Sequence, residues 1–144
     1  MKIIKLKDFK VNDSFEEFYN WLQKDLNKVN KIILETLETD SSLITELSNH
    51  IIGAGGKRIR PLLTLATARL CHYSGNRHLI LASVIEFIHT ATLLHDDVVD
   101  GSKKRRGKKT ANFIWGNKSS ILVGDFLLSK AFKILINDGS LKCI

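Results

Sequence analysis

The segment from Leu79 to Leu94 constrains the fold of this chain more than any other part of the sequence. It is apolar almost throughout, and Glu86 is its one charged residue. A helix that is apolar on nearly all sides is stable only when neighbouring elements surround it. The segment therefore predicts a helix at the centre of a helical bundle.

Helical periodicity extends over the rest of the chain. Apolar residues recur every three or four positions between Phe15 and Leu37, and Asp13 with Glu16 forms a capping-box pattern. Further helices are predicted from Ser41 or Ser42 to Gly53, from Leu62 to about Tyr73 with Pro61 in the first turn, from Asn76 to Asp100, and from Asn117 or Gly124 to about Asn137. Residues 101–109 predict a loop, and no strand pattern is expected. The fold class is all-α, with one domain over residues 1–144 whose first 12 residues we expect to be flexible.

Composition narrows the class of protein. The 144 residues are 44% hydrophobic and 26% charged, as in one globular domain, which excludes a disordered chain. The two cysteines, Cys71 and Cys143, are too few for a disulfide scaffold and predict a reducing, cytoplasmic location. The longest run without Lys, Arg, Asp or Glu is ten residues, from Leu47 to Gly56, so no transmembrane segment is expected.

Positive charge is concentrated in two short clusters. The net charge is +7, of which residues 103–109 carry +6 and the trio Lys57, Arg58 and Arg60 carries +3. Local positive charge predicts an anionic partner such as a phosphate group, a nucleic acid or a lipid surface. Nucleic-acid binding through residues 103–109 is the least favoured of these interpretations, and it would show as a steep salt dependence of affinity.

Three acids end the long apolar helix, in the run His95-Asp96-Asp97-Val98-Val99-Asp100. Asp96 and Asp100 are four residues apart, so on a helix they share one face at about 5–6 Å. The two carboxylates repel each other and lie at the negative end of the helix dipole, which favours a cation between them. Oxygen ligands favour Mg²⁺, which commonly completes its shell with substrate phosphates. The alternative is an ordinary polar helix end whose acids are neutralised by Arg105 or Arg106.

A glycine-rich basic segment precedes the third predicted helix, with the sequence Gly53-Ala-Gly-Gly-Lys57-Arg-Ile-Arg60-Pro61. Glycines let the backbone approach an anion closely, and a helix N-terminus offers free N–H groups. The alternative is a plain turn between helices with a solvated basic rim. The basic run 103–109 follows the three acids closely, and a Mg²⁺ site next to Arg105 and Arg106 describes a diphosphate pocket that has Mg²⁺ on one side and guanidinium groups on the other.

Four motifs in this order resemble the trans-type polyprenyl diphosphate synthases, and most closely their long-chain, octaprenyl-type members. The motifs are Gly-Gly-Lys57-Arg-Ile-Arg60-Pro, then Glu86-Phe-Ile-His89-Thr-Ala-Thr-Leu-Leu-His-Asp96-Asp-Val-Val-Asp100, then Arg105-Arg106-Gly, then Trp115-Gly-Asn followed by Leu122-Val-Gly-Asp125-Phe-Leu127. The resemblance implies an isoprenoid synthase helical bundle. It also implies head-to-tail addition of isopentenyl diphosphate to an allylic prenyl diphosphate, giving a long-chain product of the kind attached to quinones, with Mg²⁺ as cofactor.

The resemblance assigns a role to each site residue. Asp96, Asp97 and Asp100 would be the catalytic acids, with Asp96 and Asp100 as the ligands of Mg²⁺ on the allylic diphosphate. Arg105 would bind the allylic diphosphate, whereas the isopentenyl diphosphate would be bound by Lys57, Arg60, His89 and Arg106. By sequence pattern alone, His89 is an ordinary core histidine. Ala91 and Thr92 would line the product tunnel, and their small side chains imply a product longer than farnesyl.

The chain departs from the family in length and in its second half. Members of the family are roughly twice as long, and no second aspartate-rich motif follows Asp100 here, where the remaining acids are Asp125 and Asp138. We therefore expect the N-terminal half of the fold, which would act as a homodimer or with a complementary C-terminal chain. The alternative is a non-catalytic remnant that binds diphosphate or Mg²⁺. Alone, the chain is expected to be marginally stable, to self-associate and to show no prenyltransferase turnover.

Overall fold

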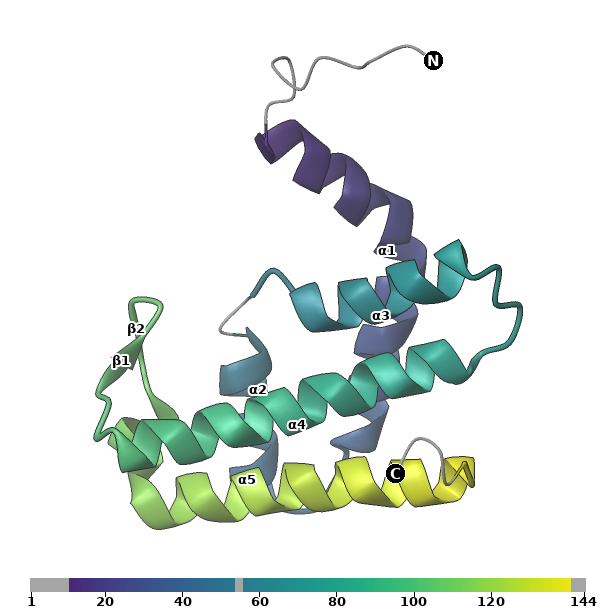
Figure 1. Ribbon diagram of the computed structural model, residues 1–144. Helices are drawn as coiled ribbons and strands as arrows, with labels where there is room; N and C mark the ends of the chain where they lie inside the picture. The colour runs from purple at the N-terminus through teal and green to yellow at the C-terminus, as the bar shows by residue number, and fades with distance from the viewer. Residues whose placement is uncertain (1–10, 54–55, 141–144) are drawn as a thin grey trace.

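The structure is a computed structural model that describes residues 11–53 and 56–140. Its elements in chain order are α1 (Val11–Thr36), α2 (Ser42–Gly53), α3 (Ile59–Leu70), α4 (Arg77–Val99), β1 (Lys104–Arg105), β2 (Lys108–Lys109) and α5 (Ala111–Asp138). Figure 1 shows α3, α4 and α5 side by side, with α1 crossing behind them. The prediction of an all-α bundle is confirmed.

Helix α4 is the centre of this bundle, as its apolar sequence predicts. It packs against α5, α3 and α1. The side chains of Ala82 and Val84, which lie on nearly opposite sides of the helix, are both buried. Burial on several sides at once explains why this helix carries so few polar residues.

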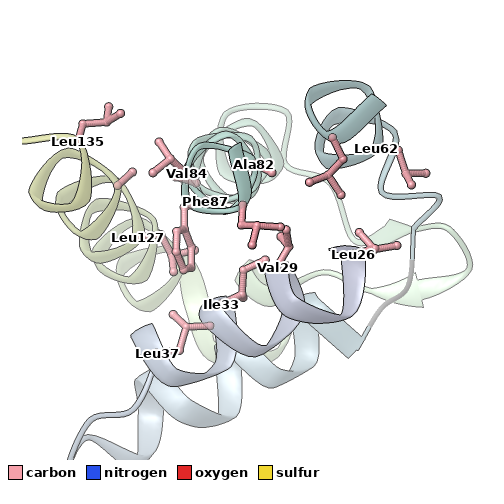
Figure 2. Packing of buried hydrophobic residues seen from close by; sticks show 14 of the residues in the cluster. Leu26, Val29, Ile33, Leu37, Leu62, Ala82, Val84, Phe87, Leu127 and Leu135 are labelled. Carbon is pink, nitrogen blue, oxygen red and sulfur yellow. The ribbon is translucent and has the colours of Figure 1, made fainter. Parts of the chain in front are cut away.

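The core forms where α1, α4 and α5 meet. Figure 2 shows Val29 and Ile33 of α1 near Phe87 of α4 and Leu127 of α5. All four side chains are at most 2% exposed. Burying each such side chain stabilises the fold by about 1.5–3 kcal/mol relative to leaving it in water. The apolar face predicted for the first helix is therefore the face that packs.

Helix α5 begins earlier than predicted and is kinked. It starts at Ala111, and Gly116 interrupts it with φ 85° and ψ 161°, a conformation that favours glycine. The predicted start at Asn117 is where the longer segment begins, whereas the predicted start at Gly124 is wrong. The first segment was missed because its short apolar stretch ends at a glycine. The predicted stop is confirmed, since Gly139 caps the helix with φ 70°.

Residues 101–109 form a small hairpin rather than an irregular loop. β1 and β2 pair antiparallel, with Lys104 opposite Lys109 and Arg105 opposite Lys108. Arg106 and Gly107 have φ of 51° and 79°, as in the two-residue turns that fit twisted hairpins. The expectation that no strand is present is therefore wrong. All four strand residues are basic and exposed, so no alternation of polar and apolar residues marks the strands.

The helix ends differ from the prediction by a few residues. α1 begins at Val11, so Asp13 lies inside the helix instead of capping it. Residues 1–10, most of the segment expected to be flexible, lie outside the described residues. α3 begins at Ile59, which keeps Pro61 in the first turn, and it stops at Leu70 because His72 takes a left-handed conformation with φ 52°.

One helix among the described residues, α4, is long and apolar enough to cross a membrane by length and composition alone. The expectation of no such segment relied on uncharged runs, whereas a span tolerates one or two charges such as Glu86. The most apolar stretch of α4 has a mean hydropathy of 1.3, and 44% of that stretch is buried inside the structure. The position of α4 in the core accounts for this apolar composition.

We expect Leu127→Ala to lower the free energy of unfolding by about 2–5 kcal/mol, because it leaves a cavity between α5 and α4. Urea unfolding followed by circular dichroism measures this change. Leu122→Ala is the matched control, since Leu122 lies on the same helix and is 65% exposed. Its effect should stay within about 0.5 kcal/mol, and equal losses for the two variants would contradict the packing described here.

Candidate anion-binding site

An open pocket of about 580 Å³ lies beside the middle of α4. Four separate segments line it: the end of α2, the loop that leads into α3 together with the start of that helix, one face of α4, and the turn of the hairpin. The pocket brings together four residues that the sequence assigned to one diphosphate, namely Lys57, Arg60, His89 and Arg106. Residues that are up to 49 positions apart in the sequence thus face one space.

His89 and Arg60 contact each other directly at this pocket. Nη1 of Arg60 lies 3.1 Å from Nε2 of His89. Because a guanidinium has only donors, Nε2 accepts this hydrogen bond and the imidazole is neutral, with its proton on Nδ1. Partial burial, followed by the positive charge of Arg60, lowers the pKa of His89 below its usual 6.5. His89 therefore offers a neutral N–H donor beside a fixed positive charge.

Arg106 and Lys57, which both line the pocket, each contact a different part of the chain. The guanidinium of Arg106 packs so close to Gly56 that a methyl group on that glycine would collide with it. Nζ of Lys57 lies 5.3 Å from the centre of the Phe15 ring, in a cation–π contact with α1. The glycine thus permits the close approach of the hairpin, and an aromatic side chain holds the lysine.

The three acids at the end of α4 differ in burial and in hydrogen bonding. Asp96 and Asp100 are exposed, as expected for carboxylates that share a solvent-facing side. Asp97 is buried, and its side chain accepts hydrogen bonds from Nε of Arg105 at 3.0 Å and from Nη2 at 2.8 Å. Hydrogen bonding to Asp97 raises the pKa of Arg105. The sequence left open the alternative that Arg105 or Arg106 neutralises the acids at this helix end. For Asp97 this alternative is correct, because Arg105 pairs with it.

The Asp97–Arg105 pair ties the hairpin to α4. Nδ2 of Asn112 adds to this link by donating to the backbone oxygens of Asp97 at 3.0 Å and of Ser102 at 3.1 Å. Arg105 lies outside the large pocket and lines a smaller neighbouring cavity of about 70 Å³. The structure thus places Arg105, assigned by the sequence to the allylic diphosphate, on an acid of its own chain.

A cation at this site would rest on two carboxylates. Among the described residues no cluster of three or more His, Cys, Asp or Glu side chains could hold a metal ion. Asp96 and Asp100 match the mode in which Mg²⁺ takes one or two carboxylates and fills its shell with water and substrate phosphates. The donor set therefore fits Mg²⁺ held jointly by the protein and a phosphorylated ligand.

The two residues assigned to product length face different ways. Ala91 is 1% exposed and belongs to the core, whereas Thr92 is exposed and its hydroxyl donates to the backbone oxygen of His89 at 2.8 Å. Neither residue lines the 580 Å³ pocket.

Two site residues were missed by the sequence reasoning, Glu86 and Arg58. They form an ion pair at the floor of the pocket, and both side chains are largely buried. One signal was available, because Glu86 is the single charge in an otherwise apolar segment and a buried charge needs a partner. The partner itself could not be found from spacing, since 28 positions separate the two residues.

Comparison with known proteins shows which family this chain resembles in sequence. The family model described as "Polyprenyl synthetase" matches residues 41–144. The octaprenyl diphosphate synthase of Escherichia coli K12 is 50% identical over 131 residues, which are 91% of this chain and 41% of that protein. The all-trans-nonaprenyl-diphosphate synthase of Rhodobacter capsulatus is 44% identical over 115 residues, or 79% of this chain and 35% of that protein.

Solved structures agree with these sequence matches. A decaprenyl diphosphate synthase from Rhodobacter capsulatus superposes with a TM-score of 0.86 at 49% identity, over 89% of this chain and 40% of that one. A polyprenyl synthase from Caulobacter crescentus CB15, complexed with calcium and isoprenyl diphosphate, gives 0.85 at 47% identity, over 89% and 39%. The chain thus spans about 40% of the length of these relatives.

We expect Asp97→Ala to lower the free energy of unfolding by about 1.5–3 kcal/mol, because it removes hydrogen bonds between charged groups that join the hairpin to α4. Thermal or urea unfolding measures the change. Asp96→Ala removes the same group one residue earlier, at an exposed position, and should change stability by no more than about 0.5 kcal/mol. If both variants were equally stable, Asp97 would not anchor the hairpin.

Proposed function

The chain belongs to the polyprenyl synthetase family, and from this premise we propose that it carries the isopentenyl diphosphate site of a long-chain polyprenyl diphosphate synthase. The reaction would join isopentenyl diphosphate head-to-tail to an allylic prenyl diphosphate. The observation that carries the proposal is the convergence of Lys57, Arg60, His89 and Arg106 on one pocket. The names of the relatives, which are octaprenyl, nonaprenyl and decaprenyl synthases, support a long-chain product.

The pocket has the chemistry that a diphosphate requires. Arg60 and Arg106 offer planar forks of N–H donors that match phosphate oxygens, and Lys57 adds a point charge. His89 contributes its Nδ1–H donor without adding a further like charge to the arginines. A bound diphosphate would replace the repulsion among these cations by charge-assisted hydrogen bonds.

We propose Mg²⁺ as the cofactor, held by Asp96 and Asp100 together with an allylic diphosphate. Bound there, Mg²⁺ would neutralise negative charge that develops on the departing diphosphate. The protein residues prepare this position, because the Asp97–Arg105 pair fixes the end of α4 and leaves Asp96 and Asp100 facing solvent. We propose that Arg105 binds the allylic diphosphate. Asp97 would assist by holding the Arg105 side chain in place through their ion pair.

Partners, product length and location are further parts of the proposal. We propose that the chain acts as a homodimer or with a complementary chain, and the Bacillus subtilis relative named "Heptaprenyl diphosphate synthase component 2", 35% identical, supports a second component. The small side chains of Ala91 and Thr92 favour a product beyond farnesyl. We propose a reducing, cytoplasmic location, as the small number of cysteines in the sequence predicts.

We expect the chain to bind isopentenyl diphosphate and Arg60→Ala to weaken that binding about 10- to 100-fold. The reason is the loss of charge-assisted hydrogen bonds worth about 1.5–3 kcal/mol. Isothermal titration calorimetry measures the affinity. Lys133→Ala is the control, since it removes one positive charge at an exposed position of α5 outside the pocket and should leave the affinity unchanged. If both variants lost the same affinity, binding would depend on the overall positive charge of the chain and not on this pocket.

We expect no prenyl transfer by this chain alone, because two exposed carboxylates supply too few ligands to balance the charge of the transition state. Radiolabelled isopentenyl diphosphate incubated with farnesyl diphosphate and Mg²⁺, followed by extraction of prenyl products, measures turnover. Incorporation of label into long products would show that a complementary set of ligands is unnecessary. Binding of isopentenyl diphosphate without turnover would agree with the proposal that this chain carries the isopentenyl diphosphate site and needs further metal ligands for catalysis.

A further inference from the structure

Glu86 is a buried acid in a pocket built for an anion. Its side chain is 12% exposed, lines the 580 Å³ pocket, and accepts a hydrogen bond from Nη1 of Arg58, whose side chain is 15% exposed. We propose that Glu86 is a positioning residue: through Arg58 it fixes the loop at residues 56–60, so that Lys57 and Arg60 face the diphosphate. This inference rests on the proposed function and adds to it a residue that would not touch the substrate.

Neither stability nor attraction of the ligand explains a carboxylate at this position. Taking two charges out of water has a free-energy cost that their mutual attraction only partly offsets. A negative charge on the wall of a diphosphate pocket also repels the ligand. The pair is therefore better explained by the geometry that it imposes on the loop.

The backbone conformation of Arg58 is consistent with its contact to Glu86. Its φ of 47° and ψ of 36° are left-handed, a strained region that non-glycine residues rarely occupy. In this conformation the Arg58 side chain turns toward α4, whereas Lys57 and Arg60 stay exposed. The contact with Glu86 stabilises this turn of the loop.

The same residue also begins α3. The backbone oxygen of Arg58 accepts a hydrogen bond from the backbone N–H of Leu62 at 3.0 Å, which joins it to the first turn of the helix. Arg60 lies in that turn and contacts His89, which is three residues beyond Glu86 on α4. Two neighbouring contacts, Arg58 with Glu86 and Arg60 with His89, therefore join the start of α3 to one face of α4.

The core beneath the pair holds it in place. Arg58 and Glu86 both line a very small cavity together with Ile33 of α1 and Leu127 of α5. Ile33 and Leu127 are at most 2% exposed, so the pair lies against buried side chains of the core. The ion pair therefore joins the loop to the core as well as to α4.

Glu86→Gln tests the inference, because the two explanations predict changes of opposite sign. If Glu86 were only a charge near the pocket, removing it would tighten the binding of isopentenyl diphosphate. As a positioning residue, its loss should weaken binding at least fivefold. Isothermal titration calorimetry decides between them, and Glu86→Asp, which keeps the carboxylate, should restore affinity to within about threefold of the original chain. Tighter or unchanged binding by Glu86→Gln would overturn the inference.

The double variant Arg58→Gln with Glu86→Gln keeps the test valid if the single variant does not fold. It leaves no unpaired buried charge and preserves the net charge of the chain. We expect circular dichroism to show that the double variant folds. It should bind isopentenyl diphosphate at least fivefold more weakly, because the loop no longer contacts α4 through Arg58 and Glu86. Binding equal to that of the original chain would again overturn the inference.

The result is separable from the proposed function. If the original chain does not bind isopentenyl diphosphate, or if Arg60→Ala has no effect, the proposed site itself is wrong. If Arg60→Ala weakens binding and Glu86→Gln does not, the site stands and the positioning role of Glu86 fails.

Discussion

Burial of α4 on several sides at once is the constraint on which the rest of this structure depends. A helix with one charged residue in its apolar segment cannot face water, so α1, α3 and α5 must cover it. Every functional group described above is attached to α4 or to a segment that packs on it. The core therefore determines both the stability of the chain and the positions of its charges.

Charges are concentrated where that core meets the solvent. The acids lie at the end of α4, and the basic residues come from the α3 loop and from the hairpin that follows α4. Two ion pairs connect these segments to the helix, Glu86 with Arg58 and Asp97 with Arg105. Each pair uses one acid from α4 and one arginine from a cluster, and the pocket is lined by Lys57 and Arg60 of one cluster and by Arg106 of the other.

The comparison of Asp96, Asp97 and Asp100 shows how far sequence reasoning reaches. Spacing alone predicted that Asp96 and Asp100 share a face, because the period of a helix is known in advance. The role of Asp97 could not be predicted in the same way, since it depends on a hairpin that returns toward α4. Two positive φ angles, at Arg106 and Gly107, make that return possible, and basic strands of two residues carry no recognisable pattern.

By itself, the sequence determined the helical class, the central position of the 79–94 segment and the two clusters of positive charge, because these follow from local periodicity and composition. It also identified the family, through motifs that are contiguous in the chain. Only the tertiary structure decided that Arg105 contacts Asp97, that Glu86 contacts Arg58, and that Arg60 contacts His89. The last two contacts join residues almost 30 positions apart. Their formation depends on how whole helices pack, which no local pattern specifies.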